Sequence, residues 1–190
     1  MTLTAVADEI MERLPGWRAE VIHGQLLISP LRDASHACAL TDLLVRFAAV
    51  GLHGTDTDVL QNVGLRLPTG ADDYAIPDLV IVDADIDDHL VENNCCAPAC
   101  FRLVLEVTSS YRTTDLHIKA SAYAAATIPV YVTVDREQRR LHVLTAPVGG
   151  VYTDHRVHAT DEIVTLPDSI GAKVTLDVDQ ILKAGQRKVS

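Results

Sequence analysis

The chain has 190 residues, of which 48% are hydrophobic, and a formal net charge of −10 at pH 7. This composition excludes a disordered chain, and no apolar run approaches the roughly 20 residues that a membrane-spanning helix needs. The negative charge argues against broad non-specific binding of nucleic acid, which depends on cations that neutralise phosphates, but it is compatible with a small basic cleft. We expect a single domain over residues 1–190.

Residues 1–14, MTLTAVADEIMERL, lack the basic and apolar regions of a signal peptide, so we expect a cytoplasmic protein without a membrane anchor. Its four cysteines are then most simply free thiols. Three of them stand in the stretch CCAPAC, at the end of an irregular acidic loop expected over residues 85–100. A zinc site is the alternative, but zinc ligands usually come in two paired clusters, and no second cluster follows.

Hydrophobic periodicity predicts two helices and a hairpin in the first third of the chain. Residues 3–13 have the amphipathic pattern of a short helix. Residues 18–30 alternate like the strands of a β-hairpin that turns at His23-Gly24. From Asp33, a residue type that caps helices, a second helix with an apolar stripe extends to a stop signal at Gly51.

Strands dominate the rest of the chain, and one further helix is predicted over residues 114–126. The segment FRLVLEV (101–107) is almost continuously apolar, as expected for a central strand that is covered on both faces. The other predicted strands lie at 57–68 (one strand or a bent pair), 77–84, 129–135, 140–146, 151–158, 162–166 and, with a terminal helical turn, 171–182. This order predicts an α/β (α+β) fold, with a mixed central sheet flanked by helices, an N-terminal hairpin and antiparallel C-terminal strands.

Two acids stand at the ends of apolar strands. Asp78 opens one strand and Glu106 lies near the C-terminal end of another, so their carboxylates converge if the strands are neighbours. Two carboxylates with water or phosphate oxygens suit Mg²⁺, which can activate a water and stabilise phosphate charge. Lys119, the only lysine in residues 1–172, would assist by neutralising the developing charge.

Each of these residues also has an ordinary explanation that the sequence leaves open. Asp78 could end a turn, and Glu106 could be a strand-end acid that reaches solvent, because an unpaired buried carboxylate is costly. Lys119 could form an exposed pair with Asp115, four residues earlier on the same helix, worth about 0.3–0.5 kcal/mol. His36 could be an exposed polar residue of the second helix.

Several segments in order resemble the motifs of the Uma-two family, bacterial proteins described as restriction endonucleases of the PD-(D/E)XK nuclease superfamily. The segments are AEVIHGQLLISP, PDLVIVDA, LVLEVTSS, TTDLHIKASAY, IPVYVTVD and GAKVTLDVDQIL. The resemblance spans about residues 15–183. It implies a restriction-endonuclease-like core, which is a mixed central sheet flanked by helices.

The resemblance also implies a site in which Asp78 and Glu106 jointly hold Mg²⁺ or Mn²⁺. The superfamily usually places its lysine two residues after the second acid, where this chain has Thr108. The family takes the lysine from the next helix, and Lys119 matches that position. His36 matches a recurrent histidine of the family and would add to the metal site.

Further residues would line the same cleft. Glu20 matches a recurrent acid in the hairpin, and Tyr123 lies one helical turn beyond Lys119. The candidate cations for DNA contact are Arg66, Arg102 and Arg112, together with Arg139 and Arg140.

Three functional hypotheses follow. The first is a metal-dependent endonuclease that hydrolyses phosphodiester bonds of DNA, as a homodimer because cutting both strands needs two sites. The second is a catalytically silent protein that keeps the nuclease fold for binding or regulation, which the charge of −10 favours. The third is a small structural or toxin-associated partner protein.

Overall fold

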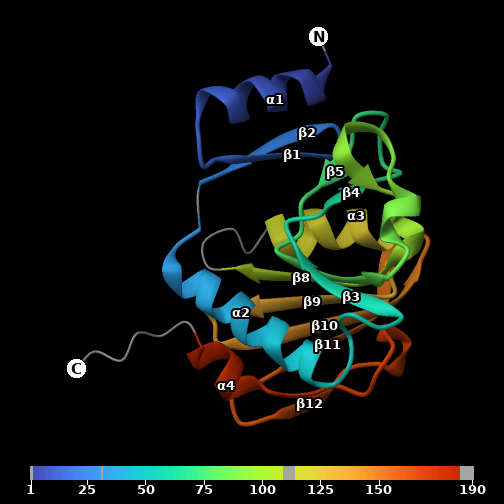
Figure 1. Ribbon diagram of the computed structural model, residues 1–190. Coiled ribbons are helices and arrows are strands. Elements are labelled where there is room, and N and C mark those ends of the chain that lie inside the picture. Colours follow the sequence, from blue (N-terminus) through green and yellow to red (C-terminus); the bar gives the residue numbers. More distant parts are fainter. Residues whose placement is uncertain (1, 31, 109–113, 185–190) are drawn as a thin grey trace.

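A six-stranded mixed sheet forms the centre of the computed structural model, which describes residues 2–30, 32–108 and 114–184 (Figure 1). Its strand order is β11-β10-β9-β8-β6-β3. Strands β8 and β9 are parallel, and the other neighbours are antiparallel. The strands are β3 (Thr57–Gln61), β6 (Leu79–Asp83), β8 (Phe101–Thr108), β9 (Val130–Asp135), β10 (Arg140–Val148) and β11 (Val151–His158).

A second sheet, with the order β2-β1-β5-β4-β7, lies beside the first and was not expected from the sequence. It is built on the predicted hairpin. Its strands are β1 (Arg18–Ile22), β2 (Gln25–Ser29), β4 (Gly64–Arg66), β5 (Tyr74–Ala75) and β7 (Cys95–Cys96). The expected bent pair at 57–68 is confirmed, since β3 joins the central sheet and β4 joins the small one.

The region 85–100 differs in one respect from the irregular loop that was expected. It contains the 3-10 turns η1 (Ile86–His89), η2 (Glu92–Asn94) and η3 (Pro98–Cys100), but Cys95 and Cys96 form strand β7 and pair with β4. The cysteines of this region are free and buried, and burial raises the pKa of both Cys95 and Cys100 to about 11. These thiols therefore stay protonated at neutral pH and serve as small apolar residues.

The helices follow the sequence signals closely. Helix α1 (Leu3–Arg13) begins at Thr2, its cap, and α2 (Ala34–Ala49) follows its cap Asp33, whose carboxylate accepts a hydrogen bond of 2.7 Å from the His36 backbone N–H. The remaining helical elements are η4 (Thr114–Lys119, a π-helical turn), α3 (Ala120–Ala125), η5 (Asp168–Ile170) and α4 (Val178–Lys183). Among the helices of the described ranges, none has the length and apolar character needed to cross a bilayer.

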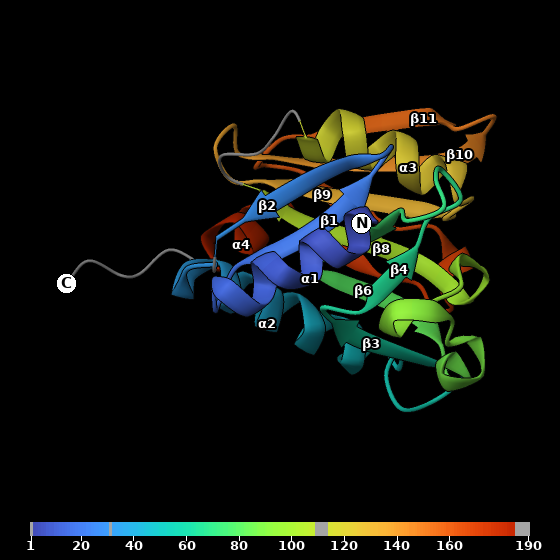
Figure 2. The same ribbon diagram turned by 90° about the horizontal axis from the view of Figure 1, so that it is seen from above.

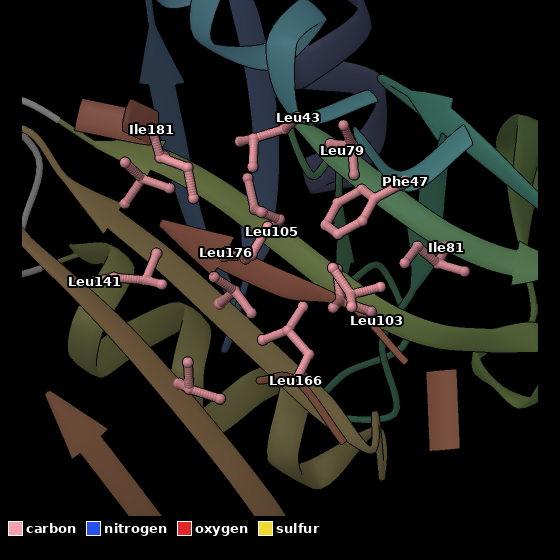
Figure 3. Close-up of a cluster of buried hydrophobic side chains, with 14 of the residues drawn as sticks. Leu43, Phe47, Leu79, Ile81, Leu103, Leu105, Leu141, Leu166, Leu176 and Ile181 are labelled. Carbon is pink, nitrogen blue, oxygen red and sulfur yellow. The ribbon is translucent and has the colours of Figure 1, made fainter. Parts of the chain in front are cut away.

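The two faces of the central sheet have different covers. One face packs against α2, α4 and the short ribbon of β12 (Ile163–Thr165) and β13 (Thr175–Asp177), in the core drawn in Figure 3. The other face packs against α3 and the inner face of the small sheet. Helix α1 covers the outer face of the small sheet, as the view from above shows (Figure 2). Each leucine or isoleucine buried in these layers stabilises the fold by about 1.5–3 kcal/mol.

Side-chain alternation determines where the polar residues of the central strands point. Leu103, Leu105 and Val107 belong to the core on the α2 side, whereas Val104 belongs to the core on the α3 side. Because successive side chains of a strand point to opposite faces, Glu106 points towards α3 and the small sheet.

Candidate functional site

The two strand-end acids lie side by side on neighbouring strands. Strands β6 and β8 are antiparallel, with Leu79 opposite Leu105, so Asp78 stands beside Glu106. The carboxylate of Asp78 accepts a hydrogen bond of 2.9 Å from the backbone N–H of Val107. Asp78 is 1% exposed and Glu106 is 0% exposed, so Glu106 does not reach solvent. The condition for their convergence, that the two strands are neighbours, is therefore met.

Lys119 reaches into this site from the turn before α3. Its Nζ atom lies 2.7 Å from Glu106 Oε1 and 3.1 Å from Glu20 Oε1. One helical turn later, the hydroxyl of Tyr123 donates a hydrogen bond of 2.8 Å to Glu106 Oε1. The side chain of Asp115, the alternative partner of Lys119, lies outside the described residues. Lys119 is only 2% exposed, so it is not a solvated surface lysine.

Arg18 and His36 surround the second acid, Asp78. The guanidinium of Arg18 donates hydrogen bonds to Asp78 Oδ1, at 3.1 Å, and to the carbonyl of Ile76, at 2.9 Å. His36 Nε2 lies 3.5 Å from the same Asp78 oxygen. His36 is buried, so it is not the exposed polar residue that the sequence left open.

The small sheet supplies Arg18 and Glu20 from one face of β1. These residues alternate with Ala19 and Val21, which pack under α1, so both point towards the central sheet. Glu20 Oε1 also accepts a hydrogen bond of 2.8 Å from the backbone N–H of Ile76. Sequence analysis identified Glu20 and missed Arg18, although their i, i+2 spacing in a predicted strand would have placed both on one face.

The groups around each side chain of the site determine whether that side chain is charged. Burial alone would raise the pKa of Asp78, but a hydrogen bond from His36 and the charges of Arg18 and Lys119 hold that pKa well below its usual value. Burial lowers the pKa of Arg18, and the surrounding carboxylates outweigh this effect and raise it. Burial and the charge of Glu106 raise the pKa of Tyr123 well above its usual value, so its hydroxyl remains a donor. Asp78 is therefore ionised throughout the physiological range.

Other predicted residues lie at varying distances from the acids. Thr108 is 1% exposed and points to the same face of β8 as Glu106; its hydroxyl has no hydrogen-bond partner within the described ranges. Arg102 pairs with Asp83 at the opposite end of β6 from Asp78, and Arg66 donates a hydrogen bond to the carbonyl of Ala71. Arg112 lies outside the described residues. Contact of these arginines with nucleic acid stays a prediction.

One further cation near the site was missed from the sequence. Arg136 directly follows β9, and its backbone N–H donates a hydrogen bond of 3.1 Å to the carbonyl of Thr108. Its guanidinium lies 3.6 Å from Asp33, the cap of the helix that carries His36. The available signal was its place directly after a strand that is parallel to β8, since parallel strands end at the same edge of a sheet.

A known protein family covers most of the chain. The model of the Uma2 family, described as "Putative restriction endonuclease", matches residues 7–179. The chain belongs to the Uma2 family. No curated protein matches the sequence of this Uma2 chain.

A solved structure shares the fold of this Uma2 protein. It is the crystal structure of a protein described as a putative nuclease belonging to DUF820, from Anabaena variabilis, with a TM-score of 0.69 and 13% sequence identity. The match covers 88% of this chain and 91% of that chain. At this identity the likeness shows the fold alone, and it confirms the restriction-endonuclease-like core predicted from the sequence.

The donor set of the Uma2 site suits a hard divalent cation held by few protein ligands. Within residues 2–30, 32–108 and 114–184, no three His, Cys, Asp or Glu side chains form a ready ligand group. Mg²⁺, however, often binds through one or two carboxylates and keeps several waters. The adjacent carboxylates of Asp78 and Glu106 fit that requirement, provided that they share their oxygens between the ion and the neighbouring cations. The role of His36 as a further ligand stays a prediction.

Proposed function

We propose that this Uma2 protein is a metal-dependent endonuclease that hydrolyses phosphodiester bonds of DNA. The observation that carries the proposal is the buried contact of 2.7 Å between Lys119 and Glu106, beside Asp78. Removing charged groups from water costs several kcal/mol per ion, so clusters of this kind are more frequent at functional sites than in ordinary cores. The order of the two acids and the lysine along the chain is also the order that the resemblance to this family implies.

The residues would divide the chemistry among themselves. Asp78 and Glu106 would hold Mg²⁺ or Mn²⁺, which supplies charge stabilisation and acidifies a water. Lys119 would donate a hydrogen bond to the attacking water or to a phosphate oxygen, in place of the lysine that the superfamily usually has at the position of Thr108. Tyr123 keeps Glu106 oriented by its hydrogen bond of 2.8 Å.

We also propose a DNA contact, a cellular compartment and an oligomeric state for this reaction. Arg136, whose backbone N–H donates to the carbonyl of Thr108, would contact a phosphate of the DNA strand. The protein would act in the cytoplasm as a homodimer, because two sites are needed to cut both strands of a duplex.

A cleavage assay tests the proposal. Purified protein is incubated with labelled duplex DNA, single-stranded DNA and RNA in Mg²⁺, Mn²⁺ or EDTA. We expect cleavage of DNA in the presence of Mg²⁺ or Mn²⁺, and a loss of at least about 100-fold in Glu106→Gln and Lys119→Met. Glu9→Gln and Lys183→Met are matched controls, because both side chains lie on the surface, 46% and 61% exposed. Folded wild-type protein that binds Mn²⁺ and cuts none of these substrates would overturn the proposal.

A second candidate is a catalytically silent protein that keeps the nuclease fold. The observation in its favour is that both carboxylate oxygens of Asp78 already have partners, which are Arg18, His36 and the backbone N–H of Val107. Titration calorimetry with Mn²⁺ separates the two candidates. No binding to wild type, with binding that appears in Arg18→Gln, would favour the silent protein, whereas wild-type binding that disappears in Glu106→Gln favours the nuclease.

A further inference from the structure

Strand β11 forms one edge of the central sheet, and this edge is long for an uncovered strand. It contains eight residues and pairs with β10 (Figure 2); within the described strands it has no second neighbour. Three valines of this hairpin are exposed, with Val148 at 64%, Val151 at 58% and Val157 at 50%. Such an edge offers a row of backbone N–H and C=O groups to another strand.

The alternation of the neighbouring strands determines which residues of β11 offer these groups. The backbone N–H of Arg136 donates to the carbonyl of Thr108 in β8, so Asp135, one residue earlier, directs its backbone groups to its partner Arg140 in β10. In steps of two along β10, residues 141, 143 and 145 then turn their backbone groups to β11, where their partners are residues 158, 156 and 154. The alternation is interrupted nearer the turn, at Ala146, which has a φ of 55° and no partner in the register. The backbone groups of His155 and Val157 therefore point away from β10 towards the free edge.

The charges on this edge distinguish between the ways in which two copies could pair. In an antiparallel pair of identical strands, residues with outward groups must stand opposite one another. Registers with the two-fold axis at residue 154, 155 or 156 place Asp154 opposite itself, Asp154 opposite Arg156, or Arg156 opposite itself, respectively. Like charges directly opposite are destabilising, and opposite charges are stabilising. Only the middle register, centred on His155, is favourable.

We propose that β11 pairs antiparallel with β11 of a second copy of this chain, about a two-fold axis at His155. Asp154 then faces the partner subunit's Arg156, and the symmetry repeats this contact. Thr153 faces the partner subunit's Val157, and both residue types favour strands. The His155 imidazole lies 3.0 Å from that of His142 in its own chain, and burial lowers the pKa of His155, although Asp154 opposes this effect, so the axis carries no pair of like charges. Two six-stranded sheets become one continuous sheet.

The pairing has a geometric consequence for the candidate site. Residues that pair across the axis point to the same face, so the α3 faces of both copies lie on one side of the joined sheet. The two β8 strands are then separated by seven inter-strand steps of about 4.8 Å, which is about 34 Å along the sheet. This is close to one turn of duplex DNA, a relation that rests on the proposed function. The interface itself does not depend on that function.

Sedimentation equilibrium over micromolar to hundred-micromolar concentrations, without metal or DNA, tests the interface. We expect a wild-type dimer, and a Kd raised at least about tenfold in Arg156→Asp and in Asp154→Arg, because each change puts like charges opposite twice. The double variant Asp154→Arg/Arg156→Asp restores opposite charges and should dimerise like wild type. The two residues also pair within one strand at 3.1 Å while remaining exposed, so the melting temperature should change little.

A cysteine placed on the axis gives a second, independent readout. In a Cys38→Ala background, which removes the exposed native thiol, His155→Cys should form an intermolecular disulfide under mild oxidation. Val157→Cys is the matched control, because in this register it stands opposite the partner subunit's Thr153 and not opposite itself. A monomer at every concentration, a dimer that ignores the charge changes, or equal cross-linking of both cysteine variants would overturn the proposal.

Discussion

Strand β6 has an aspartate at each end, and the two residues have different surroundings. Asp78, directly before the strand, is 1% exposed and is contacted by Arg18, His36 and the backbone N–H of Val107. The side chain of Asp83, the last residue of the strand, is 32% exposed and pairs with Arg102. At the first end β1 and α2 bring their side chains over the strand, whereas at the second end water reaches the carboxylate. Packing of distant elements thus decides whether a strand-end acid is a surface residue or part of a fixed charge cluster.

Among the substitutions that test this contrast, Lys119→Met should cause the largest loss of stability. The change leaves Glu20 and Glu106 buried without the ammonium between them, and breaking a buried pair in this way costs about 3–5 kcal/mol. Lys183→Met, which removes a surface lysine paired with Asp179, should cost at most about 0.5 kcal/mol. Urea denaturation measures both values. Equal losses in the two variants would mean that the buried cluster contributes nothing beyond a surface pair.

The two aspartates of β6 can be compared directly. Asp78→Asn should cost about 2–3 kcal/mol, because a buried amide group replaces an acceptor of several hydrogen bonds, and Asp83→Asn less than about 1 kcal/mol. The pKa of Asp78 is depressed on folding, so its contribution is present above the unfolded-state pKa of about 4 and is lost as pH falls towards the folded-state pKa. Asp78→Asn should therefore flatten the loss of stability between about pH 5 and pH 2.

The hydroxyl of Tyr123 should have a smaller effect. Tyr123→Phe removes its hydrogen bond to the buried Glu106 carboxylate and should cost about 1.5 kcal/mol. Tyr152→Phe is a matched control, because that hydroxyl donates to a neutral carbonyl, that of Ile128, and should cost about 1 kcal/mol or less. Thermal unfolding of both variants checks the order. A greater loss in Tyr152→Phe would contradict the importance of the bond to Glu106.

The smallest effect is expected at the exposed end of β6. Arg102→Gln removes the pair with Asp83 and should cost less than about 1 kcal/mol. Because both groups are in contact with water, this cost should shrink further at high salt. The cost of Asp78→Asn should hardly change under the same conditions. If salt reduced both costs equally, the two ends of the strand would not differ in solvent access.

Much of the site could be predicted because it lies on strongly patterned segments. Asp78 and Glu106 flank apolar runs whose burial fixes their faces, and Lys119 and Tyr123 are four residues apart on the helical segment that packs above β8. Arg18 was missed because its contacts, Ile76 and Asp78, are 58 and 60 residues away along the chain. No local pattern encodes such a contact.

In the fold, too, the strongly patterned segments could be predicted and the features that depend on distant contacts could not. The central sheet and its helices were predicted because their strands are long enough for periodicity to be read. The small sheet was not, since β4, β5 and β7 have three, two and two residues, too few to show a period of two. These short strands are formed by tertiary pairing with β1 and with one another.

The hydrogen bond from Val107 to Asp78 ties the candidate site to the pairing of β6 with β8 in the core. The same side chains that would cut DNA also hold two strands and a helix together. A lineage that stopped cutting DNA would therefore keep Asp78, Glu106 and Lys119 under selection for folding alone. The presence of these three residues in a relative does not by itself distinguish an active enzyme from a protein that no longer catalyses a reaction.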